Sequence, residues 1–208
     1  MKRILLLVLT ALLLLTACSK DELAVIVLDA DGYGCTNTET GVHYTVLSPA
    51  FEPAKSAAAQ GTYTNEKTGA KTTYYEIPSL DPARYLTDDM QNVWCAEDIL
   101  PKASALTPVA LLICEEGAIS VEVTRLTAAD DGATVDALLT LWFEGEAARL
   151  PEGAKTYMYR VKMMSEELPN IFYCFSFAVW GEEAYFYDLF SSRAVLVPRA
   201  LAEKFPKK

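Results

Sequence analysis

The stretch Ile171-Phe172-Tyr173-Cys174-Phe175-Ser176-Phe177-Ala178-Val179 decides the fold class. Large apolar residues occupy every second position of it, namely Ile171, Tyr173, Phe175, Phe177 and Val179. This period of two predicts a β-strand with one strongly apolar face. Gly181-Glu182-Glu183 follows the stretch and predicts a turn into another strand.

Alternating or continuously apolar segments recur on both sides of this strand. They lie at 42–47, 72–77, 108–114, 119–124, 135–143, 157–163, 185–189 and 195–197, with a further candidate at 93–95. In the fifth of these, Val135, Ala137, Leu139, Leu141 and Phe143 are interpreted as the inner face of a strand. The sequence therefore predicts a mainly β fold, an antiparallel sandwich- or barrel-like domain with short helical additions.

The predicted strands differ in regularity along the chain. Residues 23–208 are expected to form a single mainly β domain, in which 23–105 are less regular and 106–197 form regular antiparallel strands. Residues 198–205 predict a short terminal helix, because a proline suits the first helical turn. A looser subdomain over 18–105, packed on the sheet, is the alternative.

The chain is acidic, with 18 Lys and Arg against 28 Asp and Glu and a formal net charge of −10. The phosphates of nucleic acid would repel such a domain, so no nucleic-acid partner is expected. Anionic lipid would repel it for the same reason. Any membrane attachment must therefore come from a feature other than surface charge.

The first eighteen residues have the composition of an export signal. Lys2 and Arg3 precede an apolar run over 4–15, which has the length of a signal-peptide core. This run is shorter than the roughly 20 apolar residues that a membrane-spanning helix needs. Leu15-Thr16-Ala17-Cys18 follows it.

This leader resembles the lipobox of bacterial lipoproteins, Leu-(Ala/Ser/Thr)-(Gly/Ala)-Cys. The resemblance implies that residues 1–17 are a lipoprotein signal peptide, that Cys18 carries a diacylglyceryl lipid, palmitate included, and that 18–22 form a short tether. Two or more acyl chains give stable anchoring. The expected location is the bacterial cell envelope, on the extracytoplasmic face of a cell membrane. The alternative is an ordinary secretory signal in which Cys18 is incidental.

Four cysteines follow Cys18, at positions 35, 95, 114 and 174. Export permits disulfides, and Cys35 with Cys95 is the first pairing expected, because both lie in less regular segments. Free buried thiols, which behave as small hydrophobic groups, are the alternative. The spacing contains no CxxC pair, which argues against a zinc ribbon.

No familiar catalytic motif is present. His43 is the single histidine, and its place on the polar side of a strand favours a solvated residue over a catalytic base. Segment 29–34 partly resembles the start of an EF-hand loop, but Tyr33 and Thr40 stand where calcium ligands are needed, so a turn is the better interpretation. Acidic doublets at 88–89, 115–116, 130–131, 166–167 and 182–183 are interpreted as solvated turn tips. We predict no metal, cofactor or catalytic residue.

The tryptophans suggest one binding hypothesis. Trp142 and Trp180 are out of phase with the predicted core residues around them, so together with Trp94 they are candidates for an exposed ligand platform. Burial in the core is the alternative, because strands favour aromatic residues in any case.

The expected function is that of a lipid-anchored cell-envelope protein with a non-catalytic binding or interaction domain. A glycan or an envelope protein is the expected partner, besides the membrane that the lipid on Cys18 contacts. The alternatives are a carboxylate-dependent envelope hydrolase and a structural or regulatory partner of a membrane protein.

Overall fold

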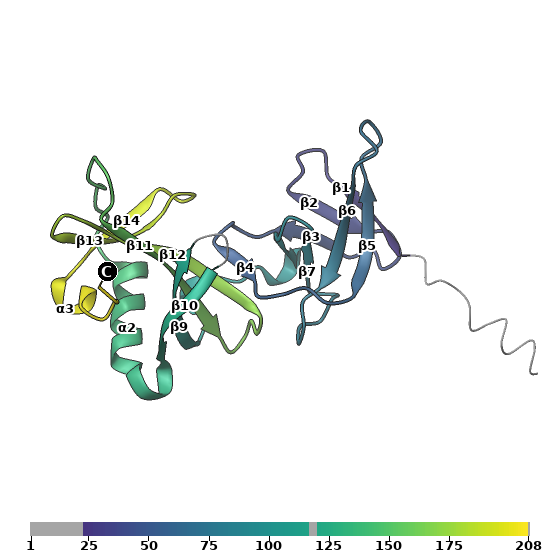
Figure 1. Cartoon of the computed structure of the whole chain (residues 1–208). Coiled ribbons are helices and arrows are strands. Elements are labelled where there is room, and N and C mark those ends of the chain that lie inside the picture. Colours follow the sequence, from purple (N-terminus) through teal and green to yellow (C-terminus); the bar gives the residue numbers. More distant parts are fainter. Residues whose placement is uncertain (1–22, 117–119, 208) are drawn as a thin grey trace, which may run out of the picture.

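The structure is a computed structural model that describes residues 23–116 and 120–207 (Figure 1). The predicted signal peptide, the lipidation site at Cys18 and the tether lie outside the described residues. The mainly β prediction is confirmed, because the described strands form a closed barrel and a second sheet. Figure 1 shows the barrel and the second sheet as two adjacent units, with the first described strand on the far side of the barrel from the second sheet.

The barrel is built from seven of the described strands, all short. These are β1 (Ala24–Leu28), β2 (Gly34–Asn37), β3 (His43–Val46), β5 (Ala59–Thr64), β6 (Lys71–Glu76), β7 (Tyr85–Asp88) and β8 (Val93–Ala96), in the order β1-β2-β3-β8-β7-β6-β5. A parallel pairing of β1 with β5, with Ala24 opposite Gly61, closes the barrel. A Cβ atom at Gly61 would lie 2.9 Å from the carbonyl oxygen of Ala24, so glycine permits this close approach.

The second sheet contains the longer strands. These are β9 (Pro108–Glu116), β10 (Ser120–Thr127), β11 (Tyr157–Ser165), β12 (Ile171–Trp180), β13 (Glu183–Asp188) and β14 (Arg193–Val197), in the order β10-β9-β11-β12-β13-β14. A short strand from the N-terminal half, β4 (Phe51–Pro53), pairs antiparallel with the beginning of β12. The chain thus returns one strand from the barrel region to the second sheet.

The predicted strand at 135–143 is wrong, because these residues lie in helix α2 (Ala128–Glu144). Thr127 caps the helix by accepting a hydrogen bond from the backbone N–H of Asp130. The buried residues of α2 are Val135, Leu138, Leu139 and Trp142, which follow the spacing of one helix face. The apolar residues of 135–143 fit the strand period of 2 and the helix period of 3.6 equally well. The acidic doublet at 130–131, interpreted as a turn, lies in the first turn of the helix.

Helix α2 covers one face of the second sheet and forms the largest core cluster of the described residues with it. Trp142 stacks on Phe175 with ring centroids 4.9 Å apart. The predicted terminal helix is present as α3 (Arg199–Ala202), and beyond it Phe205 stacks on Phe177. No helix within the described ranges is long and apolar enough to cross a membrane.

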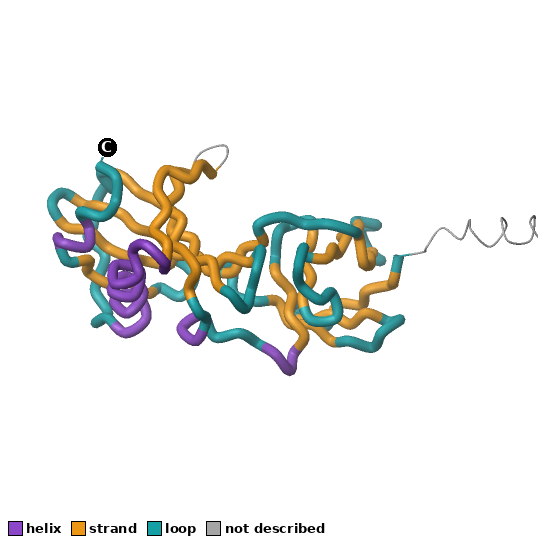
Figure 2. The backbone as a smooth tube through the Cα atoms, turned by 90° about the horizontal axis from the view of Figure 1, so that it is seen from below, coloured by secondary structure: helices purple, strands orange, loops and turns teal. Residues whose placement is uncertain are grey.

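The barrel and the second sheet share a hydrophobic core at their junction. Leu47, Phe51 and Val93 come from the barrel half, and Leu168 and Ile171 come from the second sheet or the loop before β12. The connector between β8 and β9 carries two short 3-10 helices, η2 (Glu97–Ile99) and η3 (Ala103–Ala105), as Figure 2 shows. β4 and this shared core fix the two units against each other.

The predicted Cys35–Cys95 disulfide is not formed. Cys35, Cys95, Cys114 and Cys174 are all free and buried. Cys35 packs in the barrel core with Ile26 and Trp94, whereas Cys95 packs in the junction core. The two thiols therefore belong to different clusters, and each fills space as a small apolar group.

Candidate functional site

The predicted tryptophan platform is wrong, because Trp94, Trp142 and Trp180 are 4%, 1% and 9% exposed. Each indole N–H is satisfied inside the protein. Trp94 donates to the Asp88 carboxylate, Trp142 to the Tyr173 hydroxyl and Trp180 to the Gly153 carbonyl, at 3.0, 3.1 and 3.3 Å. The α-helical geometry of 128–144 explains the error at Trp142, since a helix places it on the inner face.

His43 lies between two carboxylates on the barrel surface. Its Nε2 is 2.9 Å from Oδ2 of Asp29, and its Nδ1 is 3.3 Å from Oε2 of Glu97. The hydrogen bond with Asp29 is the main cause that raises the pKa of His43. A raised pKa favours the imidazolium, which cannot accept a proton, so this arrangement does not support a catalytic base.

The segment at 29–34 is a turn between β1 and β2. The backbone N–H of Asp29 donates to the carbonyl of Gly34 at 2.9 Å, and that of Gly32 donates to the carbonyl of Asp29 at 3.0 Å. A Cβ at Gly34 would overlap the Asp29 carboxylate, so glycine makes room for the Asp29–His43 pair. In the part of the chain that the structure describes, no group of three or more His, Cys, Asp or Glu side chains is placed to hold a metal ion.

The prediction of a solvated turn tip at 88–89 is wrong for Asp88, which is buried, whereas Asp89 is exposed. Asp88 is buried and accepts hydrogen bonds from the backbone of Met90 and Asn92 as well as from Trp94. Asp89 accepts from the backbone of Thr73 and from the hydroxyl of Tyr75. Asp88 therefore organises the β7–β8 turn from within, whereas Asp89 links this turn to β6 and stays exposed.

A different charged cluster lies where β4 joins the second sheet. Arg160 and Lys162 on β11 both form ion pairs with the Glu52 carboxylate on β4, Arg160 through Nη2 and Lys162 through Nζ at 3.0 Å. The side chains of Arg160, Lys162 and Glu52 are 14%, 16% and 30% exposed. Glu116 lies 3.8 Å from Nε of Arg160 and is more exposed. Three charged groups are thus largely withdrawn from water in one small volume.

The alternation of β11 places these cations. Tyr159, Val161 and Met163 pack toward α2, so Arg160 and Lys162 point from the opposite face of the sheet. On that face Lys162 lies opposite Cys174 of β12, and Glu52 lies opposite Phe172. The β4–β12 pairing therefore brings the carboxylate to the cations.

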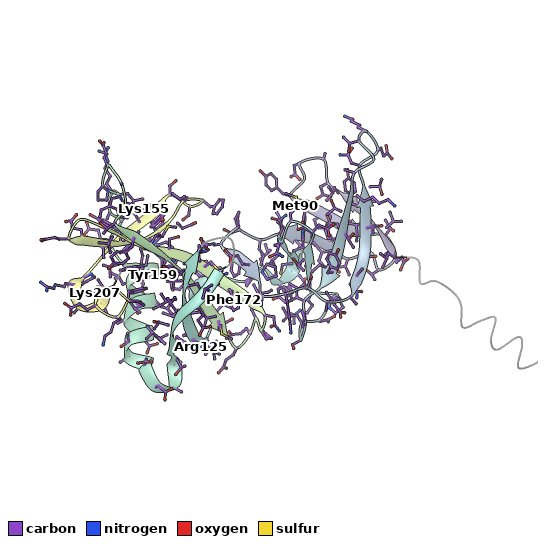
Figure 3. The ribbon with its side chains drawn as sticks, viewed as in Figure 1. Met90, Arg125, Lys155, Tyr159, Phe172 and Lys207 are labelled. Atoms are coloured by element: carbon purple, nitrogen blue, oxygen red, sulfur yellow. The ribbon has the colours of Figure 1, made fainter. Side chains whose placement is uncertain are left out.

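A pocket of about 430 Å³ opens beside this cluster, and we call it the seam pocket. Its walls come from 47–54 of the β3–β4 segment, from 90–93 of the β7–β8 turn, and from Lys162 and Phe172 of the second sheet. The lining residues are Leu47, Pro49, Phe51, Glu52, Pro53, Ala54, Met90, Gln91, Asn92, Val93, Lys162 and Phe172. Figure 3 shows Met90 on the barrel and Phe172 on the second sheet. Pockets of about 300–1,000 Å³ accommodate small ligands.

The electrostatics of the cluster keep all three groups charged. Burial alone would raise the pKa of Glu52, but the charges of Arg160 and Lys162 outweigh it and lower that pKa. Burial opposes the charge of Lys162 as well, yet Glu52 raises its pKa above the ordinary value. Beneath them, burial raises the pKa of Cys174 well above its ordinary value and keeps it a neutral thiol.

The alternation of the strand predicted at 157–163 puts Arg160 and Lys162 on its polar side, but no pattern in the sequence associates them with Glu52. The carboxylate is 108 residues away from Arg160 along the chain. Pro49 and Pro53 on either side of it interrupt any strand pattern, so β4 was not predicted. The one local signal was the pair of basic residues at alternating positions in an otherwise apolar strand.

No protein-family model, no curated protein and no solved structure matches this chain. The described residues define a mainly β protein of two adjoining units with a charged pocket at their junction.

Proposed function

We propose that this protein is a lipid-anchored cell-envelope protein whose two β units form a non-catalytic binding domain, with the seam pocket as its ligand site. The observation that carries the proposal is the pocket itself. Segments of both units line it, and the charged side chains of Glu52 and Lys162 stand in its wall beside the apolar Phe172. Most of the accessible surface of this lining is polar, which suits a ligand that carries a polar or charged group.

The titratable groups near the pocket favour binding over proton transfer. A general acid needs a carboxyl whose pKa is raised toward neutrality. Glu52 has its pKa lowered by two cations, and the raised pKa of Cys174 disfavours a thiolate nucleophile. The hydrolase alternative therefore has less support than a binding role.

The anchor would set the orientation of the molecule. β1 begins at Ala24 and lies on the side of the barrel away from the second sheet (Figure 1). A lipid on Cys18, a few residues earlier, would hold the barrel next to the membrane and leave the second sheet and the seam pocket facing outward. Ligands presented by the envelope, such as a glycan or a segment of an envelope protein, would reach the pocket from that side.

Two experiments test the two halves of this proposal. Labelled palmitate should be incorporated into the wild type and not into Cys18→Ala, and equal labelling of both would contradict the anchor.

Affinity capture from native envelopes should recover a specific partner with the wild type and not with Phe172→Ala, which removes an aromatic ring from the pocket lining. The matched control Tyr33→Ala removes an exposed aromatic residue from the barrel and should capture as the wild type does. Equal capture by wild type and Phe172→Ala would contradict the seam pocket as the ligand site.

A further inference from the structure

We infer that the seam pocket binds a small organic monoanion, a carboxylate joined to an apolar body, through the ammonium of Lys162. The inference rests on the proposed function and adds the chemical class of the ligand. Its starting point is a shared ion pair. The protein carries a net charge of −10, yet two cations largely withdrawn from water beside this pocket, Arg160 and Lys162, share the carboxylate of Glu52.

The distribution of ion pairs in the cluster favours a carboxylate ligand at Lys162. Arg160 pairs with two carboxylates, Glu52 and Glu116, whereas Lys162 pairs with Glu52, which it shares with Arg160. Buried charge is stable when it is paired, and the carboxylate of a ligand would give Lys162 a partner of its own. A doubly charged phosphate would place more negative charge beside Glu52 than a monoanion does.

Lys162 is the group that a ligand can reach. It lines the pocket, whereas Arg160 does not. An ammonium has three N–H donors, and the hydrogen bond to Glu52 uses one of them. Arg160 donates a hydrogen bond to the other oxygen of Glu52. This bond fixes the carboxylate, and the carboxylate in turn fixes the position of the Lys162 ammonium in the pocket lining. Lys162 would therefore contact the ligand directly, and Arg160 would act as a positioning residue.

The pocket lining also contains apolar side chains that the apolar body of the ligand would contact. Phe172 of the second sheet and Met90 of the β7–β8 turn both line the pocket, and Met90 is 78% exposed. The β7–β8 turn holds Met90 in that exposed position, because the buried Asp88 carboxylate accepts the backbone N–H groups of both Met90 and Asn92. A flexible thioether and an aromatic ring in the lining of one pocket suit apolar molecules of varied shape.

The test compares an acid with its neutral isostere. The full chain, reconstituted in phosphatidylcholine nanodiscs and labelled at its methionine methyl groups, is titrated with 4-phenylbutyrate and with 4-phenylbutyramide. The Met90 methyl signal, assigned with Met90→Leu, should move with both probes, and the carboxylate should bind at least tenfold more tightly. In Lys162→Met this preference should vanish, whereas the control Lys71→Met, at an exposed lysine outside the pocket, should keep it.

Salt provides a readout that needs no variant. Raising sodium chloride from 50 to 500 mM should weaken binding of the carboxylate in the wild type and leave binding of the amide unchanged. If both probes move Met90 with equal affinity, or if the preference survives in Lys162→Met, the monoanion inference is overturned and the pocket remains a ligand site. If neither probe moves Met90, the inference and the ligand site fall together.

Discussion

Strands β11 and β12 have two faces of different chemistry, because successive residues of a strand point to opposite sides of the sheet. One face presents Val161, Phe175 and Phe177 to helix α2 and is completely apolar in its centre. The other presents Arg160 and Lys162 to Glu52 across the β4–β12 pairing. Burial of the apolar face stabilises the fold, because apolar surface is removed from water. Burial of the charged face costs hydration free energy, and the ion pairs offset only part of that cost. The first face therefore maintains the fold, and for the second we propose a role in ligand binding.

The largest expected effect is on the apolar face. Trp142→Ala should lower the free energy of unfolding by about 3–5 kcal/mol, because it empties the space between α2 and the sheet. It also removes the stacking on Phe175 and the hydrogen bond to Tyr173. Urea denaturation followed by circular dichroism measures the change. Phe190→Ala, at a ring that is 66% exposed, should change the same quantity by less than about 0.5 kcal/mol. Similar losses in both variants would contradict the assignment of Trp142 to the core.

A smaller effect is expected when the charged face loses its carboxylate. Glu52→Gln leaves Arg160 and Lys162 without their shared partner, and we expect a loss of about 1–3 kcal/mol in the free energy of unfolding. The cluster is partly solvated, which keeps the loss below that of a fully buried pair. The exposed Glu66→Gln should change stability by less than about 0.5 kcal/mol. No loss in Glu52→Gln would mean that the two cations are already compensated by water.

The advantage of wild type over Glu52→Gln should depend on pH. The folded-state pKa of Glu52 is lowered from its ordinary 4.5, so the stabilisation is fully present above that value and disappears as the pH falls through the folded-state pKa. Urea unfolding of the two proteins at several pH values between 7 and 3 measures the difference. A difference that stays constant to the acid end, or grows there, would show that the ion pairs are not its source.

The smallest effect concerns His43 on the barrel. Asp29→Asn should lower the pKa of His43, because the hydrogen bond with Asp29 is the main cause that raises it. Glu97→Gln should lower it less, since Glu97 makes the smaller contributions. The shift of the imidazole Cε1–H signal with pH measures both values. A larger change in Glu97→Gln would reverse the roles of the two carboxylates.

The fold was predictable where one face of a strand packs on a core. Ile171 to Val179 alternate cleanly, and the predicted strand matches β12 closely. The barrel strands β2 and β7 were not predicted, because they have only four residues each, too few for a period to stand out. Residues 135–143 were assigned the wrong period, because their apolar residues fill strand and helix positions alike.

The charged face was harder to predict from sequence than the apolar face. An apolar residue can be buried against many different partners, so the alternation of apolar residues along a strand is enough to predict a buried face. Lys162 needs Glu52, which only the pairing of β4 with β12 brings within 3.0 Å. The tryptophans were mispredicted for the same reason. Their residue type suggested an exposed platform, but contacts with residues distant in the sequence bury them.

The most direct test of the charged face as a ligand site is a calorimetric titration of 4-phenylbutyrate into wild type and Lys162→Met. Glu52 keeps Arg160 as a partner in this variant, so Lys162→Met should unfold within about 1 kcal/mol of wild type. We expect this well-folded variant to bind the carboxylate at least tenfold more weakly than the wild type does. Equal affinity in the two proteins would mean that the charged face is not the ligand site.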